Sequence, residues 1–251
     1  MVNSTGSRYP HPGIRVVRVV GSGVLKGVLF VLIAVALAGL TACSSGSGEA
    51  TSTGPLALDQ RVVTEEDAPG SKPDPVEKQQ IAPDEQAFSD TMGDAFINPT
   101  DEEKARLGTI GFVKAIRDTR YFGDVHSRDD LHTFSLVVQF DSPDGAKEMA
   151  DFFHTDGVRP CPESCAFSVT EFDVGGIPGA TGVRRYASEE AVKTAGTAEN
   201  RPYDSYDIQF ADGDFAYRIE LGGPPGKPSE DKAVEIAQNL YDRVHGRPTA
   251  G

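Results

Sequence analysis

The chain has 251 residues, with 24 Lys and Arg against 38 Asp and Glu, which gives a formal net charge of −14. This acidic balance disfavours nucleic acid as a partner, because phosphate contacts need clustered basic side chains. It is typical of a soluble, self-repelling surface, with capture of cationic ligands or metal as the alternative.

The first 42 residues have the layout of an export signal. A basic stretch containing Arg15, Arg18 and Lys26 precedes an apolar run at 27–40, and small residues follow it. A positive region, a short apolar region and a small-residue cleavage site are the three parts of such a signal. An uncleaved anchor is the alternative, but the run is shorter than the about 20 apolar residues that a bilayer span needs.

The segment ends in Leu40-Thr41-Ala42-Cys43. This tetrapeptide resembles the lipobox of bacterial lipoproteins, in which the cysteine is acylated and the preceding signal peptide, here residues 1–42, is removed. The resemblance implies a lipoprotein with a palmitate-type anchor on Cys43, held at the extracytoplasmic face of the cell membrane. Removal of residues 1–42 leaves 20 basic against 38 acidic side chains. Such a surface disfavours docking on anionic lipid, so attachment to the membrane rests on the acyl chains.

The other two cysteines, Cys161 and Cys165, have three residues between them in sequence. In an oxidising compartment an even number of cysteines indicates a disulfide, and we expect this pair to form one. A free thiol pair, a metal site and a redox pair are the alternatives. A zinc site needs about four ligands and only His154 lies nearby, while a thioredoxin-type motif has two intervening residues. We therefore expect no metal and no cofactor.

Composition divides the rest of the chain. Residues 43–54 are rich in Ser and Gly and are predicted to be a flexible linker, with a random-coil reach of about 18 Å. Residues 55–82 are rich in charge and proline. Their composition fits either disorder or one short strand laid against the domain, and we expect partial order. The globular domain is expected at 83–246, with a tail at 247–251.

Hydrophobic periodicity predicts the elements of the first half of the domain. Residues 131–140 alternate most clearly, with Phe134, Leu136, Val138 and Phe140 on one face. The expected elements are a helix at 83–96, a short helix begun by Thr100, strands at 112–122 and 131–140, and a helix that Ser142 caps and that ends before Gly157.

The second half is predicted to hold strands at 167–174 and 183–187, a hairpin, and a helix capped by Ser229. Asp212-Gly213 suits a two-residue hairpin turn. The pairs expected across that hairpin are Phe210 with Phe215, Ile208 with Tyr217, Tyr206 with Ile219, and, on the opposite face, Asp207 with Arg218.

Strands lead twice into a Ser-capped helix, at 131–154 and at 206–244. This order fits either two β-β-α repeats or a common local pattern. Both predict an α+β fold in which helices pack on one face of an antiparallel β-sheet, a two-layer sandwich.

Three short motifs are explained more simply as loops or turns than as functional sites. His126-Ser127-Arg128-Asp129-Asp130 holds groups useful in hydrolysis, but catalytic groups usually converge from distant elements, and a loop between strands is simpler. The glycine-rich 175–182 lacks the lysine and hydroxyl of a phosphate loop, so a turn is expected. Asp212-Gly213-Asp214 lacks the later ligands of a calcium loop.

Five aromatic residues cluster in sequence around the hairpin. They are expected to pack in the core under the last helix, although a cleft there could bind a small apolar molecule. The five are Tyr203, Tyr206, Phe210, Phe215 and Tyr217.

A lipobox followed by a small α+β domain resembles the lipoproteins of actinobacteria, and the Arg, Ala and Gly usage fits that source. The strand–strand–helix order is similar to the Mog1/PsbP-type sandwich of some mycobacterial lipoproteins, and more weakly to the extracellular sensor domains of mycobacterial Ser/Thr kinases. The resemblance is one of pattern, and no functional residue transfers beyond Leu40-Thr41-Ala42-Cys43.

These observations favour a membrane-anchored envelope lipoprotein that is not an enzyme and that binds a protein partner or a small ligand. The alternatives are an envelope hydrolase using His126 or His154, and a carrier of lipids or other hydrophobic molecules. A hydrolase requires a pocket that gathers a histidine, an acid and a nucleophile. A carrier requires an enclosed apolar cavity.

Overall fold

The computed structural model describes residues 56–76, 79–92, 105–123, 130–159, 167–195 and 201–248, all within the compact unit Ser52–Gly251. The lipobox, Cys43, His126 and the pair Cys161 and Cys165 lie outside these residues. The expected acyl anchor and disulfide therefore stay predictions.

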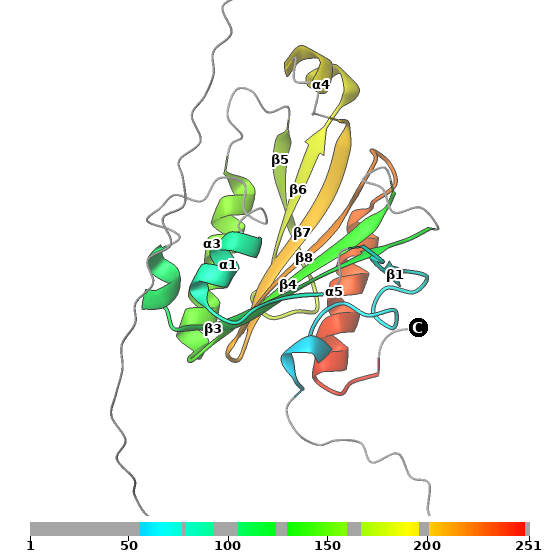
Figure 1. Ribbon diagram of the computed structural model, residues 1–251. Helices are drawn as coiled ribbons and strands as arrows, with labels where there is room; N and C mark the ends of the chain where they lie inside the picture. Colours follow the sequence, from blue (N-terminus) through cyan, green and yellow to red (C-terminus); the bar gives the residue numbers. More distant parts are fainter. Residues whose placement is uncertain are drawn as a thin grey trace, which may run out of the picture. The chain divides into compact units, whose positions relative to one another are not determined.

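One antiparallel sheet runs through the molecule in the strand order β1-β3-β4-β8-β7-β6-β5, with β2 also paired to β3 (Figure 1). It confirms the predicted α+β class and antiparallel sheet, and the four strands expected outside the hairpin begin and end within two residues of their predicted limits. The strands are β1 Lys72–Pro73, β2 Gln80–Ala82, β3 Phe112–Tyr121, β4 His132–Phe140, β5 Ser168–Asp173, β6 Thr181–Ala187, β7 Tyr203–Asp212 and β8 Phe215–Gly223.

Both serine caps are confirmed. Ser142 Oγ accepts from the Gly145 amide at 3.3 Å, and Ser229 Oγ accepts from the Lys232 amide at 3.4 Å. The helix after Ser142 continues through Gly157 to Val158, and the short helix α4 was not predicted. The helices are α1 Glu85–Met92, α3 Pro143–Val158, α4 Glu189–Ala195 and α5 Glu230–Val244, with 3₁₀ helices η1 Leu58–Gln60 and η3 Leu107–Thr109.

The two long helices lie on opposite faces of the sheet (Figure 1). On β4, Leu136 and Val138 pack with the apolar residues of α3, while Val137 packs with those of α5. The expectation that helices cover one face is therefore corrected. Three consecutive residues of β4 are all fully buried, which is possible only in a strand covered on both sides.

The hairpin register differs from the predicted one by two residues. Asp212 pairs with Phe215, so Gly213 and Asp214 form the loop, and Gly213 has the positive φ of 54° that a turn of this type needs. Phe210 pairs with Tyr217 and their rings stack with centroids 4.5 Å apart. A shift of two keeps each side chain on its predicted face.

Residues 56–76, here called the strap, lie against the α5 face of the sheet. Leu58, Val62, Val63 and Ala68 are buried in the same core cluster as α5. Packing therefore extends upstream of Pro83 into the segment 55–82, which the sequence predicts to be partly ordered. These apolar residues follow no helical or strand period, so the sequence pattern could not show that they are buried.

In the part of the chain that the structure describes, no helix has the length and apolar character required to cross a bilayer.

Candidate functional site

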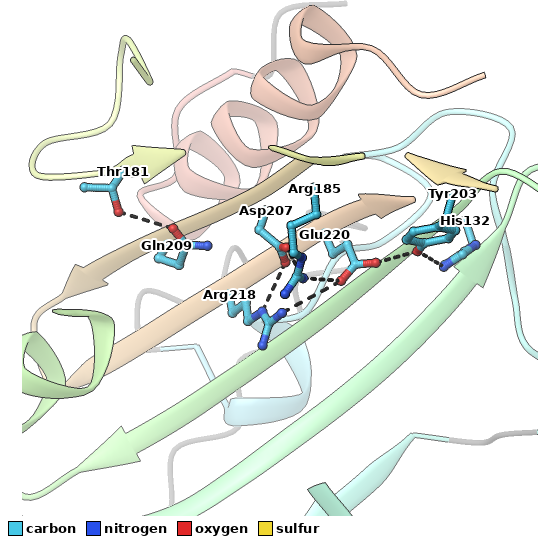
Figure 2. Close-up of polar contacts among 8 residues, drawn as sticks. All are labelled: His132, Thr181, Arg185, Tyr203, Asp207, Gln209, Arg218 and Glu220. Carbon is cyan, nitrogen blue, oxygen red and sulfur yellow. Dashed lines mark hydrogen bonds and ion pairs between the residues drawn. The ribbon is translucent and has the colours of Figure 1, made fainter. Parts of the chain in front are cut away.

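A chain of polar contacts crosses the α3 face of the sheet at the end opposite the β7–β8 hairpin (Figure 2). Its side chains come from four neighbouring strands, β4, β6, β7 and β8. We call it the Tyr203 network, and its members are His132, Arg185, Tyr203, Asp207, Arg218 and Glu220.

Tyr203 is the centre of this network. Its hydroxyl donates to Glu220 Oε1 at 2.6 Å and lies 3.2 Å from His132 Nε2, so the phenol reaches from β7 across β8 to β4. It can do so because Gly222 has no side chain. A Cβ at Gly222 would lie 2.0 Å from the Tyr203 hydroxyl oxygen. Burial, followed by the neighbouring carboxylate of Glu220, raises the pKa of Tyr203 well above its ordinary value.

His132 is held through both ring nitrogens. Nδ1 lies 3.0 Å from the Asp130 carbonyl oxygen, and a carbonyl only accepts, so Nδ1 carries a hydrogen. The single hydroxyl proton of Tyr203 is directed to Glu220. The two contacts hold the ring in place between the Asp130 carbonyl and the Tyr203 hydroxyl.

The charged half of the network balances two arginines against two carboxylates. Asp207 is fully buried, accepts from Arg218 Nε at 3.1 Å and pairs with Arg185. Burial raises the pKa of Asp207 in spite of both arginines. Burial also opposes ionisation of Glu220, but Arg185 and Arg218 outweigh it and lower the pKa of that carboxyl. Glu220 is therefore ionised.

The network carries the predicted charge pair of the hairpin. Asp207 and Arg218 do form an ion pair, but diagonally, because Asp207 lies directly opposite Glu220 and Gln209 opposite Arg218. The two-residue change of register thus brings Glu220, which the predicted pairing left out, into the same cluster.

Aromatic rings line the network in a row. The ring centroids of Tyr121 and His132 are 5.6 Å apart, those of His132 and Tyr203 6.1 Å, and those of Tyr203 and Phe167 6.4 Å. These four rings are partly buried, and the side chains of Arg185 and Glu220 are 12% and 15% exposed. The site therefore leaves a small part of its apolar and charged groups open to solvent.

Sequence analysis assigned Tyr203 to the aromatic core, and this is corrected. Tyr206, Phe210 and Tyr217 do lie in the core under α5. Tyr203 is an odd number of residues from Tyr206 along β7, so its side chain points to the other face. That parity was visible in the sequence. The role of Gly222 was not, because it depends on the neighbouring strand placing the Tyr203 hydroxyl beside Gly222.

His154, the hydrolase candidate, lies elsewhere. Its Nε2 is 2.9 Å from Glu171 Oε1, and both line an open hollow of about 260 Å³ together with Thr181. The Thr181 hydroxyl donates to Gln209 Oε1 at 3.2 Å, and among the described residues the buried Nδ1 of His154 has no hydrogen-bond partner. The hollow thus holds a histidine, an acid and a hydroxyl, but the hydroxyl is not bonded to the histidine.

The two other motifs that lie within the described residues form turns. The stretch 174–180 connects β5 to β6, and its Gly175 carbonyl accepts from Gln238 of α5 at 2.7 Å. Asp212 lies 3.9 Å from Arg61 and 3.3 Å from His245, so its carboxylate has protein partners. Within the described ranges, no group of three His, Cys, Asp or Glu side chains is arranged to hold a metal ion.

Comparison with known proteins gives a structural likeness. No family model matches the chain, and no curated protein matches it. The crystal structure of the extracellular domain of PknH from Mycobacterium tuberculosis aligns with a TM-score of 0.47 and 14% identity, over 77% of this chain and 99% of that one. Similarity at this level supports no statement about function or location.

Proposed function

We propose that this protein is a lipid-anchored cell-envelope lipoprotein whose folded domain is a non-enzymatic binding module, with the Tyr203 network as its contact surface for a polar ligand or partner. One observation carries the proposal: a phenol, an imidazole and a guanidinium are fixed by bonds within the sheet yet stay partly exposed. Groups that are already oriented lose little entropy when a ligand binds.

The chemistry of the network supports recognition rather than catalysis. The raised pKa of Tyr203 keeps its proton on the phenol. Both nitrogens of His132 have hydrogen-bond partners, so neither is positioned to take a proton from a substrate. Arg185 and Glu220 offer donors and acceptors beside the rings, which is the mixture that small-ligand sites use to fix orientation.

Ligand recovery tests the binding site. The purified domain is incubated with an aqueous envelope extract, separated by gel filtration, and its bound molecules are measured by mass spectrometry. Tyr203→Phe and Arg185→Ala should each reduce the bound species about tenfold, the effect of losing one or two hydrogen bonds. His154→Ala, at the other hollow, is the matched control and should bind as wild type. Equal recovery by all four proteins would exclude the site.

Fractionation tests the anchor. Wild-type protein should partition with membranes and its N-terminal peptide should carry acyl chains, because the lipobox presents Cys43 for acylation. Cys43→Ser should move the protein to the soluble fraction. Membrane partitioning that survives the substitution would contradict the anchor and leave the binding site untouched.

A further inference from the structure

We propose that the outer edge of β5 is a docking site for an extended, basic segment of a partner protein, which adds to the sheet as one more strand. This edge is a second contact surface, and its use does not depend on ligand binding at the Tyr203 network. Three features of β5 support the proposal: an open strand edge, carboxylates on one side of it, and a fixed aromatic ring on the other.

The sheet ends at β5. This strand is the last in the strand order and pairs with β6, in a continuous register from Ser168 opposite Tyr186 to Asp173 opposite Thr181 (Figure 1). Among the described residues, no strand pairs with its other side. Proline, lysine and bulges commonly block such edges, and residues 168–173 contain none of them. The outward N–H and C=O groups of β5 can therefore bond to a strand from another molecule.

Carboxylates lie on the α3 side of this edge. Glu171 is opposite Val183 and Asp173 is opposite Thr181, so both side chains point to that face of the sheet. Both residues are exposed, and the Glu171 side chain is 66% exposed although one of its oxygens lies 2.9 Å from His154 Nε2. Two acidic side chains thus stand side by side along the open edge.

The arginines of the neighbouring strand do not neutralise these acids. Arg184 donates to both carboxylate oxygens of Asp204, at 2.9 and 3.0 Å, and Arg185 pairs with Asp207. Both aspartates are buried on β7, so the arginine charges are already balanced on the inner side of β6. The edge of β5 therefore keeps its negative charge.

The other side of β5 carries Phe172. Its ring packs edge-on against Tyr206, with centroids 5.7 Å apart, and it lies across Gly182 of β6, where a Cβ would be 2.4 Å from the ring. Phe172 is only partly buried. The ring is therefore a fixed apolar surface that the next strand along the sheet can contact.

These positions define the partner. Side chains directly opposite each other in paired strands share a face and interact. The added strand should therefore place Lys or Arg at two positions separated by one residue, facing Glu171 and Asp173, with an apolar residue between them facing Phe172. A second copy of this chain fits poorly, because two β5 strands paired about Glu171 or about Phe172 set carboxylates directly opposite carboxylates, and each chain has a net charge of −14.

Peptide binding tests the proposal. The full-length protein, purified in detergent, is titrated into fluorescein-labelled Thr-Val-Lys-Val-Lys-Val-Thr, and binding is followed by fluorescence anisotropy. The matched peptide Thr-Val-Glu-Val-Glu-Val-Thr has the same apolar pattern with the opposite charge. The lysine peptide should bind at least tenfold more tightly. Equal binding of the two peptides, or no binding of either, would overturn the proposal.

Backbone methylation separates strand addition from attraction between charges alone. Two further lysine peptides carry N-methyl groups on alternate residues, so that each has one of its two edges blocked. An added strand bonds to β5 through one edge only. One version should therefore bind as the unmodified peptide does, and the other at least tenfold more weakly. If the two versions bind alike, the peptide does not add as a strand.

Substitutions locate the binding edge. Glu171→Lys should weaken binding of the lysine peptide about fivefold or more, because it replaces a favourable cross-strand pair with a repulsive one. Glu235→Lys makes the same charge change at an exposed position on α5 and should bind as wild type. Equal weakening by both substitutions would refute the β5 edge. Tyr203→Phe should also bind as wild type, and loss of binding there would place the peptide at the Tyr203 network instead.

Discussion

Arg243 and Asp67 are 176 residues apart in sequence and form a two-pronged ion pair that joins α5 to the strap. Arg243 Nε lies 2.8 Å from Asp67 Oδ1, and Arg243 Nη2 lies 2.8 Å from Asp67 Oδ2. The Asp67 carboxylate is fully buried. The same guanidinium donates to the carbonyls of Gln60 and Val62. This arrangement satisfies an aspartate that would otherwise be costly to bury.

Arg243→Ala should lower the free energy of unfolding by about 3 kcal/mol or more, because it leaves the Asp67 carboxylate without its counter-ion. Chemical denaturation with a spectroscopic readout measures the change. Arg247→Ala is the matched control, since its pair with Asp242 is largely exposed and should contribute less than about 1 kcal/mol. Similar losses for both variants would contradict a special role of the Arg243 contact.

Asp118 should make stability depend on pH. Burial beneath the strap raises the pKa of Asp118 to about 6; Arg120 acts against the shift, and Asp74 adds to it. In the unfolded chain the carboxyl has its ordinary pKa near 3.8. The folded state therefore holds more protons between these values, so this group's contribution is present at low pH and is lost as the pH rises through 6.

Asp118→Asn removes that titration. As the pH rises from 4 to 7.5, the stability of the variant relative to wild type should increase by up to about 3 kcal/mol. This is the free energy that corresponds to a difference of about two pKa units between the folded and unfolded states. Denaturation midpoints at the two pH values measure it. If the stability difference between the variant and wild type does not change with pH, burial does not raise the pKa of Asp118.

Gly222→Ala should disturb the Tyr203 network without replacing any of its side chains. The added Cβ would overlap the Tyr203 hydroxyl, so the phenol must move and lose its bonds to Glu220 and His132. We expect about 1–3 kcal/mol of destabilisation and loss of ligand binding. Gly175→Ala, where nothing lies within 4 Å of the added carbon, is the control and should retain both.

The two remaining cysteines should form a disulfide in the exported protein. Alkylation before and after reduction, followed by mass spectrometry of the peptide containing Cys161 and Cys165, tests this. We expect label on both residues only after reduction. Because the loop is short, reduction should lower stability by about 2 kcal/mol, the low end of the usual effect. Labelling without reduction would show a free thiol pair instead.

Local patterns in the sequence determined most of the elements. The alternation at 131–140 produced β4, and Ser142 and Ser229 begin helices as their positions predict. These features depend on neighbouring residues only: a side-chain oxygen that caps an amide, or a period of two or of 3.6 residues. The Asp207–Arg218 ion pair could also be anticipated, because both positions lie on the charged face of the hairpin.

Tertiary structure decided the rest. The observed hairpin register differs from the predicted one by two residues, so that Phe210 pairs with Tyr217. Both registers place Gly213 in the turn. Packing decides between such registers, because a two-residue shift leaves the faces unchanged. The crossing of Tyr203 over Gly222 likewise depends on which strands become neighbours.

By itself, the sequence determined an acidic α+β domain, since composition and local periodicity are properties of neighbouring residues, and it predicts an export signal with a lipobox-like end. It left open whether residues 56–76 belong to the fold. Their order depends on contacts such as that of Asp67 with Arg243, whose energy exists only once α5 has packed on the sheet. Contacts between distant residues leave no period in the chain, and here they place both the strap and the candidate site.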